Sequence, residues 1–213
     1  MYNLEGILYS AIGVILAMTI HELAHGLVSY WMGDPTAKME GRLSLNPFKH
    51  IDWVGLVCLL ICGFGWAKPV PVDARYYKDQ KTGIIWTSFA GPIANFLLTF
   101  ICVFLFYAIY KFVPAFMLSQ VGQFVSNSLM YTGLISTGFG IFNLLPIPPL
   151  DGSKVLFSFL DDDKYYRFIN GTPWMNLLFI ALIMSGVLNS PLSMLRSQII
   201  QFFEMVVKMI LGF

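Results

Sequence analysis

The sequence has few charged residues and no strong charge of either sign. Only 12% of its 213 residues are charged, against about 25% in typical globular domains, whereas 57% are hydrophobic. The net charge is +1 and no long basic run occurs, so we expect no nucleic-acid partner. The composition predicts a membrane protein surrounded by the lipid bilayer rather than a soluble domain.

Cysteine is also scarce, and its three occurrences all fall in apolar stretches. Cys58 and Cys62 are four residues apart, but no second cysteine or histidine pair is near them in the sequence to complete a metal site. We therefore interpret them as small buried apolar residues. Cysteine usage gives no indication of an oxidising compartment.

Four apolar segments qualify as membrane spans or come close to the required length of about 20 residues. They cover approximately residues 4–31, 84–113, 129–145 and 174–188. The first has neither a basic region before it nor a small-residue cleavage site after it. We expect it to remain as the first helix rather than to be removed as a signal peptide.

Two further segments are ambiguous. Residues 53–66 are apolar but too short to span, and they contain three glycines, which favours a re-entrant or membrane-associated β segment. Residues 192–213 place Arg196, Glu204 and Lys208 on one helical face opposite apolar residues, which indicates an amphipathic interfacial helix or a fifth span. The expected fold is therefore an all-α polytopic membrane protein. We expect a single domain over residues 1–213, with a core at about 4–190 and a C-terminal segment at 191–213.

Basic residues predict the orientation of these spans. Lysine and arginine gather in the connections between the first and second spans and between the third and fourth. Positively charged connections face the cytoplasm, so we expect a multi-pass protein with its N-terminus outside. The end of the first span, and any site there, would then lie towards the cytoplasmic side.

Ionisable residues are costly inside a span and tend to be functional. Two of the three histidines of the chain, His21 and His25, lie in the first span with Glu22 beside them. Residues four apart on a helix are about 6 Å apart along its axis and share one face. Two imidazoles so placed can bind one zinc ion, and a neighbouring carboxylate can act as general base. In a soluble protein the same five residues could be a chance helix surface; in an apolar span we favour the metal site.

A catalytic zinc site needs a third protein ligand. His50 is one candidate, in the connection after the first span. Asp151 is the other, after a proline-rich stretch that interrupts the third span and is tolerated at depth only where protein or water satisfies the freed backbone groups. Asp151 could instead be the N-cap of a helix that begins at Gly152. Spacing alone favours the ligand but leaves both interpretations open.

These motifs resemble the site-2 protease family of intramembrane metalloproteases. The matching segments, in the family's order, are His21-Glu22-x-x-His25, Gly41-Arg42-Leu-Ser-Leu-Asn46-Pro47-x-x-His50, Ala67-Lys68-Pro69-Val70-Pro71-Val72, Gly91-Pro92-Ile-Ala-Asn95 and Asn143-Leu-Leu-Pro146-Ile-Pro-Pro-Leu150-Asp151-Gly152. Together they span most of the chain. The chain resembles a minimal form of the family, without insertions of PDZ type or a regulatory domain of CBS type.

The resemblance implies one zinc ion bound by His21, His25 and Asp151, with Glu22 as the catalytic acid and base. It implies a zinc metalloendopeptidase that cuts transmembrane substrate proteins in or near the bilayer, using a zinc-activated water. It leaves the oligomeric state open.

Three polar residues are expected to support the site or bind substrate. Asn95 and Asn143 are amides in apolar spans, and the alternative for both is an interhelical hydrogen bond worth about 1 kcal/mol. His50 is expected to position its loop rather than to bind zinc.

Two other functions compete with this reading. A metal transporter would also carry histidines in a span, but it should show further ligands along a path across the membrane. An inactive homologue acting as a binding scaffold would not need the intact Glu22. Clustering of the polar residues around one site favours the enzyme.

Overall fold

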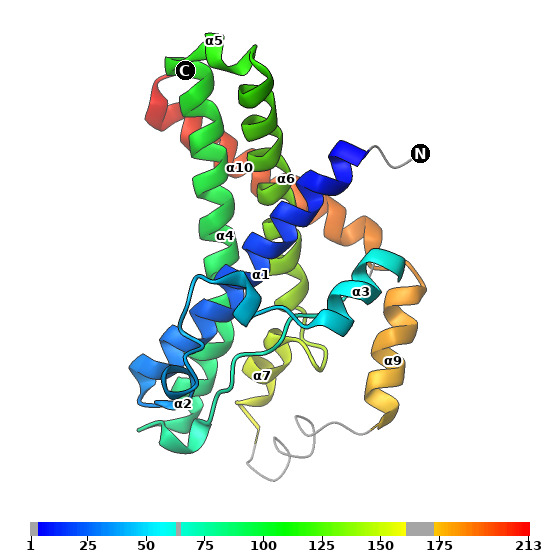
Figure 1. Cartoon of the computed structure of the whole chain (residues 1–213). Helices are drawn as coiled ribbons and strands as arrows, with labels where there is room; N and C mark the ends of the chain where they lie inside the picture. Colours follow the sequence, from blue (N-terminus) through cyan, green and yellow to red (C-terminus); the bar gives the residue numbers. More distant parts are fainter. Residues whose placement is uncertain (1–3, 63–64, 161–172) are drawn as a thin grey trace.

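Three long helices form the centre of the molecule. The computed structural model describes residues 4–62, 65–160 and 173–213, and α1 (Leu4–Met32), α4 (Gln80–Phe112) and α6 (Gln120–Asn143) pack against one another in it (Figure 1). The shorter elements are α2 (Thr36–Met39), η1 (Pro47–Lys49), α3 (Trp53–Cys62), η2 (Ala74–Tyr76), α5 (Pro114–Met117), α7 (Asp151–Phe157), α9 (Pro173–Met184) and α10 (Asn189–Leu211). The predicted all-α character is confirmed for the described residues.

Local sequence signals set the ends of the long helices. Asp79 caps α4 by accepting hydrogen bonds from the first-turn backbone, and Pro114 follows its end. Ser119 caps α6 in the same way, through the N–H of Gly122 at 3.0 Å. α1 stops at Gly33, whose φ of 117° is a conformation that L side chains rarely adopt.

The three helices meet through small and polar residues rather than through a large apolar core. The Thr99 hydroxyl lies 3.0 Å from that of Thr137, and the Ser136 hydroxyl donates to the backbone carbonyl of Asn95 at 2.8 Å. Gly13 of α1 lies so close to α6 that a Cβ there would be 3.1 Å from the Cα of Thr132. Small residues at close helix contacts, joined by hydroxyl hydrogen bonds, are typical of helices that pack in lipid.

Two of the described helices, α1 and α4, are long and apolar enough to cross a membrane. They correspond to the predicted spans at 4–31 and 84–113. Large apolar side chains of α4 project outward, among them Leu97, which is 59% exposed. An exposed apolar helix of this length suits lipid surroundings. The predicted membrane character is therefore supported, at the level of two candidate spans.

The other two predicted spans have different bounds in the structure. Most of residues 129–145 belong to α6, which begins nine residues earlier at Gln120, ends at Asn143 and is not among the candidate spans. Residues 174–188 divide between α9, which has 12 residues, and the turn before α10. The composition and length of these helices do not by themselves establish a count of four spans.

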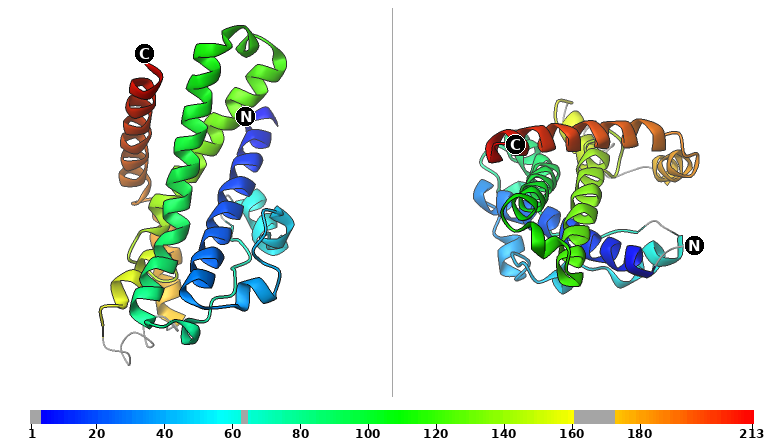
Figure 2. Two further views of the ribbon diagram at one scale, coloured as in Figure 1. Left: turned by 90° about the vertical axis from the view of Figure 1, so that its left-hand side faces the viewer. Right: turned by 90° about the horizontal axis from the view of Figure 1, so that it is seen from above.

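The two ambiguous segments are also resolved in part. Residues 53–62 form α3, and the chain next to it makes an isolated antiparallel bridge between Ile51 and Ala67; the described residues contain no β-strand. The C-terminal segment is the amphipathic helix α10, which lies across α4 and α6 (Figure 2). Phe203 of α10 contacts Phe100, and Lys111 donates to the last carbonyls of α10 at Leu211 and Gly212.

Candidate metal centre

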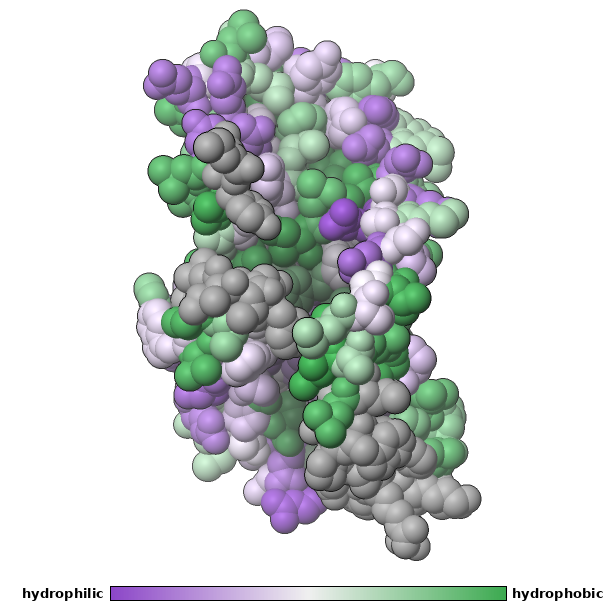
Figure 3. All heavy atoms as spheres, turned by 90° about the vertical axis from the view of Figure 1, so that its right-hand side faces the viewer, coloured by the Kyte–Doolittle hydropathy of each residue, from purple (hydrophilic) through white to green (hydrophobic). Residues whose placement is uncertain are grey.

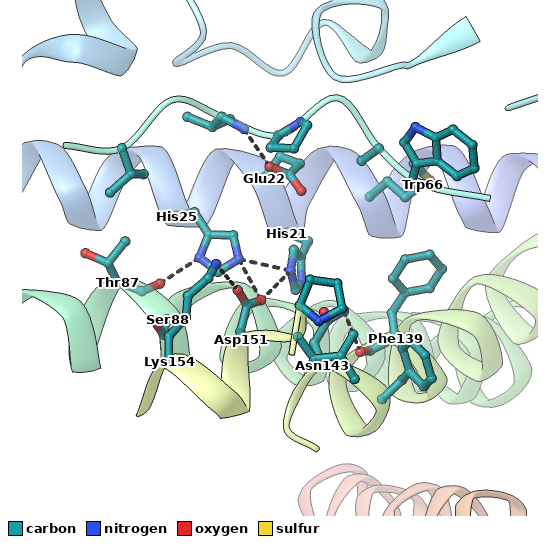
Figure 4. Close-up of a pocket in the computed structure, with 18 of the residues that line it drawn as sticks. His21, Glu22, His25, Trp66, Thr87, Ser88, Phe139, Asn143, Asp151 and Lys154 are labelled. Carbon is teal, nitrogen blue, oxygen red and sulfur yellow. Dashed lines mark hydrogen bonds and ion pairs between the residues drawn. The ribbon is translucent and has the colours of Figure 1, made fainter. Parts of the chain in front are cut away.

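The inward face of α1 meets α4 and α7 around three buried side chains. His21 and His25, one turn apart on α1, converge on Asp151 at the start of α7 (Figure 4). The two Nε2 atoms are 3.0 Å apart, and Asp151 Oδ2 lies 3.1 Å from Nε2 of His21 and 3.0 Å from that of His25. Three potential ligand atoms, from residues as much as 130 positions apart, therefore form one small triangle.

This triangle matches the ligand set of a zinc site. Nitrogen and oxygen ligands at about 2.0–2.2 Å from a tetrahedral ion are about 3.3–3.5 Å from one another. The observed separations of 3.0–3.1 Å need only a small expansion to accept the ion. Two imidazoles and one carboxylate also leave the fourth position open, as catalytic zinc sites do. Within the described residues, these three form the cluster capable of holding a metal.

The backbone of α4 orients His25. Its Nδ1 donates to the carbonyl oxygen of Thr87 at 2.6 Å, which leaves the Nε2 lone pair facing Asp151 and His21. A metal-binding histidine commonly donates its other nitrogen to a carbonyl in this way. Pro92 lies in the next turn of α4 and has no backbone N–H. The carbonyl of Ser88, four residues earlier, therefore does not receive the usual helical hydrogen bond.

Asn95 of α4 contacts the other imidazole. Its side-chain Nδ2 is 3.1 Å from Nδ1 of His21, and the residue is fully buried. The Oδ1 atom of Asn95 has no hydrogen-bond partner within the described part of the chain. Because an amide carries both a donor and an acceptor, a half-turn of the side chain presents Oδ1 to His21 instead.

Glycine 91 lets α4 approach the two histidines. A Cβ at this position would lie 2.5 Å from Cε1 of His21 and 2.5 Å from Nε2 of His25. No larger residue fits without moving an imidazole. Gly91 of the Gly91-Pro92 sequence motif therefore has a direct geometric role beside the ligands.

Asp151 does not act as a helix N-cap in the structure. Helix α7 begins at Asp151, and its N-cap is Leu150, without a side-chain cap. The second oxygen of Asp151, Oδ1, accepts from Lys154 Nζ at 2.9 Å. Burial raises the pKa of the Asp151 carboxyl, but the His25 charge, hydrogen bonds from both histidines and the Lys154 charge outweigh burial and hold that pKa below its usual range. One oxygen is thus directed at the histidines and the other at a cation.

Glu22 points to a different side of α1 from the two imidazoles, about a quarter-turn away around the helix. Figure 4 shows its carboxylate directed at the backbone that crosses α1, where Oε2 accepts the N–H of Val70 at 2.8 Å. Glu22 lines the same cavity as the three clustered residues. The cavity has a volume of about 570 Å³, and its other walls are mostly apolar, including Trp66, Phe139 and Phe142. The face that carries α3 and α9 is hollowed between hydrophobic side chains (Figure 3).

Of the other predicted site residues, Asn143 lines this cavity and His50 does not. The Asn143 amide donates to the Phe139 carbonyl at 3.1 Å, one turn earlier in α6. His50 is buried away from the cluster, with Nε2 at 2.8 Å from the Ser44 carbonyl. Its own backbone carbonyl accepts the N–H of Lys68. These contacts agree with a loop-positioning role for His50 and give it no place among the ligands.

A buried hydrogen-bonded chain connects the site to the end of α1. The Tyr77 hydroxyl lies 3.0 Å from the Thr87 hydroxyl and 2.8 Å from that of Ser29, which donates to Asp34. Burial raises the pKa of Tyr77, and at Asp34 burial alone would act in the same direction. At Asp34, however, hydrogen bonds from Thr36, from the backbone N–H of Asp73 and from Ser29 outweigh burial and lower the pKa.

Sequence reasoning missed several residues around the site. Lys154 follows Asp151 by three positions, so its pairing with Asp151 could have been foreseen on a helix. The carbonyl of Thr87 could not, because a backbone group carries no sequence signal. Arg42 was noticed only as part of a motif; in the structure it donates to the carbonyls of Lys68 and Pro69, which precede the Val70 N–H that holds Glu22.

Comparison with known proteins gives the same picture. The sequence profile of peptidase family M50 matches residues 9–186. The chain is 40% identical to the "Putative zinc metalloprotease YwhC" of Bacillus subtilis over 158 residues, which is 73% of this chain and 70% of that protein. It is 28% identical to the "Putative zinc metalloprotease Rip2" of Mycolicibacterium smegmatis over 83% of this chain and 67% of that protein. It is 31% identical to the "Putative zinc metalloprotease MJ0611" of Methanocaldococcus jannaschii over 69% of this chain and 68% of that protein. No solved structure matches the chain.

Proposed function

This chain belongs to peptidase family M50, the site-2 protease family of zinc metalloproteases, and we propose that it cleaves peptide bonds of transmembrane substrate proteins. The observation that carries the proposal is the convergence of His21, His25 and Asp151, whose three ligand atoms lie 3.0–3.1 Å apart. These three residues would hold one zinc ion. When bound there, zinc supplies a Lewis acid for the scissile carbonyl and increases the acidity of water.

Glu22 is the proposed acid and base. Its Oε2 is held by the Val70 N–H, and it lines the cavity that the metal cluster also faces. In the reaction Glu22 accepts a proton from the attacking water and returns it to the leaving amine. The amides of Asn143, in the cavity wall, and Asn95, against His21, are the proposed supports for substrate and ligand geometry.

The proposed substrate class follows from where the site lies. The motif is in α1, which is long enough to span a bilayer, and the cavity walls are mainly apolar. An extended apolar peptide segment suits such walls, whereas a charged soluble peptide does not. We propose a multi-pass protein with about four spans, α6 among them, its N-terminus outside and its active site towards the cytoplasmic side. The basic connections between the spans support this orientation.

Purified wild-type protein and two variants test the proposal. Glu22→Gln should retain stoichiometric zinc and lose cleavage of a model transmembrane substrate by at least about 100-fold, the scale expected for a general base. Glu204→Gln, on α10 and outside the cavity lining, is the matched control and should cleave normally. Full cleavage by Glu22→Gln would refute the mechanism. Zinc transport by both proteins without cleavage would favour the transporter instead.

A further inference from the structure

An extended segment crosses α1 directly over Glu22. We call residues 67–73 the strap. It begins at the bridge between Ala67 and Ile51, where the Lys68 N–H donates to the His50 carbonyl at 2.9 Å. It ends where the Asp73 N–H donates to Asp34 Oδ2 at 2.8 Å. Between these anchors the Val70 N–H donates to Glu22.

Arg42 holds the strap next to Val70. Its Nη2 donates to the carbonyls of Lys68 at 2.8 Å and Pro69 at 3.1 Å, the two residues that precede Val70. Arg42 is buried, with only 7% of its surface exposed, and its Nε has no hydrogen-bond partner within the described residues. A buried guanidinium that donates to two consecutive carbonyls fixes both peptide planes, and the second of them, Pro69–Val70, also carries the Val70 N–H.

The surface of α1 under the strap is shaped to admit it. Gly26 follows Glu22 by one helical turn and so lies on the same face. A Cβ at Gly26 would be 3.0 Å from Cγ1 of Val70 and 2.8 Å from Cδ2 of Leu43, the neighbour of Arg42. Glycine therefore allows both the strap and the Arg42 segment to reach the helix. Val70 itself is only 6% exposed, so its side chain is packed against the protein rather than facing solvent.

We propose that Arg42 is a positioning residue that acts on Glu22 through the strap. By fixing the carbonyls of Lys68 and Pro69, it directs the Val70 N–H at one carboxylate oxygen of Glu22, which leaves the other oxygen for proton transfer. The inference rests on the proposed function of Glu22. A carboxylate without this restraint samples other rotamers, and displacement of a reacting group by about 1 Å can cost about 100-fold in rate.

The test is a double-mutant cycle with kcat and zinc content as readouts. Arg42→Met keeps the length of the side chain and removes its donors; we expect kcat to fall about 10- to 100-fold with zinc content unchanged. In a Glu22→Asp background, whose shorter carboxylate cannot reach Val70 in the same way, the same substitution should lower kcat less than about 3-fold. Arg42→Lys, which restores one donor group, should recover part of the loss.

Lys49→Met is the matched control. Lys49 donates to the Gly41 carbonyl at 2.6 Å in the same loop but has no hydrogen bond to the strap. Its loss should leave kcat within about 2-fold of wild type. If Arg42→Met fails to fold, Gly26→Ala replaces it in the cycle, because the added Cβ pushes on Val70 from below and should give the same pattern.

Two results would overturn the inference: an unchanged kcat in Arg42→Met, or a loss of equal factor in both the wild-type and Glu22→Asp backgrounds. A parallel loss of zinc would also overturn it, since Arg42 would then maintain the metal site rather than Glu22. These outcomes differ from failure of the proposed function, which full cleavage by Glu22→Gln would reveal.

Discussion

Gly91→Ala provides a stringent test of the metal centre because it adds a single methyl group between α4 and the ligands. The new Cβ would lie 2.5 Å from both Cε1 of His21 and Nε2 of His25. Ordinary carbon contacts begin at about 3.5 Å, so the methyl group is about 1 Å too close to each ring. One or both imidazoles, or α4 itself, must move by a distance of that order.

A displacement of this size is large for a metal site. Ligand distances are held to within about 0.2 Å of their preferred values, so a shift of about 1 Å removes an imidazole from the ligand set. Altering groups that merely orient a ligand costs about 10- to 100-fold in affinity. We therefore expect Gly91→Ala to weaken zinc binding by at least about 100-fold, which is about 2.7 kcal/mol. Alanine in place of glycine favours the helix by about 1 kcal/mol, which offsets part of the roughly 1–3 kcal/mol that the overlap costs the fold.

The measurement is zinc affinity in competition with a chelator, with thermal unfolding in detergent as the check on the fold. Gly138→Ala is the matched control, since it lies in α6 and a Cβ there meets nothing within 4 Å. The control should bind zinc and cleave substrate like wild type. If Gly91→Ala binds zinc with wild-type affinity, the close approach of α4 to the two histidines is wrong, and so is the geometry derived from it.

Two further predictions concern the partners of the site. Asn95→Asp should retain zinc affinity, because a carboxylate accepts a hydrogen bond from Nδ1–H of His21. Asn95→Leu offers no acceptor and should weaken zinc binding about 10- to 100-fold. Equal zinc affinities for the two variants would mean that Asn95 does not act as an acceptor. Asp34→Asn should cost about 1–3 kcal/mol of unfolding free energy at pH 7, since an amide nitrogen cannot accept from Ser29 and Asp73. The pKa of Asp34 is lowered in the folded state, so its carboxylate contributes its full stabilisation of the fold above about pH 4. This contribution is lost as the pH falls through the lowered pKa. The difference in unfolding free energy between wild type and Asp34→Asn should therefore shrink in acid. A difference that stays constant from pH 7 to pH 3 would contradict this account.

The helices were predictable where hydropathy and capping agree. The spans expected at 4–31 and 84–113 correspond to α1 and α4, whose apolar length and flanking stop signals are local properties. The start of α6 was not predicted, because residues 120–128 are too polar to read as a span; the Ser119 cap and packing on α1 and α4 extend the helix there. The segment at residues 53–66 was expected to be re-entrant or β; its described residues 53–62 form the short helix α3, and the one bridge joins Ile51 to Ala67 just outside it, so apolar character with glycines did not distinguish helix from strand.

By itself, the sequence determined the family through its motifs and the membrane character through its apolar composition. It also determined the pairing of His21 with His25, because a spacing of four on a helix places two side chains on one face whatever surrounds them. Only the tertiary structure decided which groups meet that pair. Asp151 reaches it from 126 positions beyond His25. Gly91 matters only because α4 packs against α1 at that point. Glu22 is adjacent to His21 in sequence yet faces the strap, since successive residues on a helix point in directions about 100° apart. Contacts of this kind depend on helix packing and on backbone groups, and neither has a signature in a single sequence.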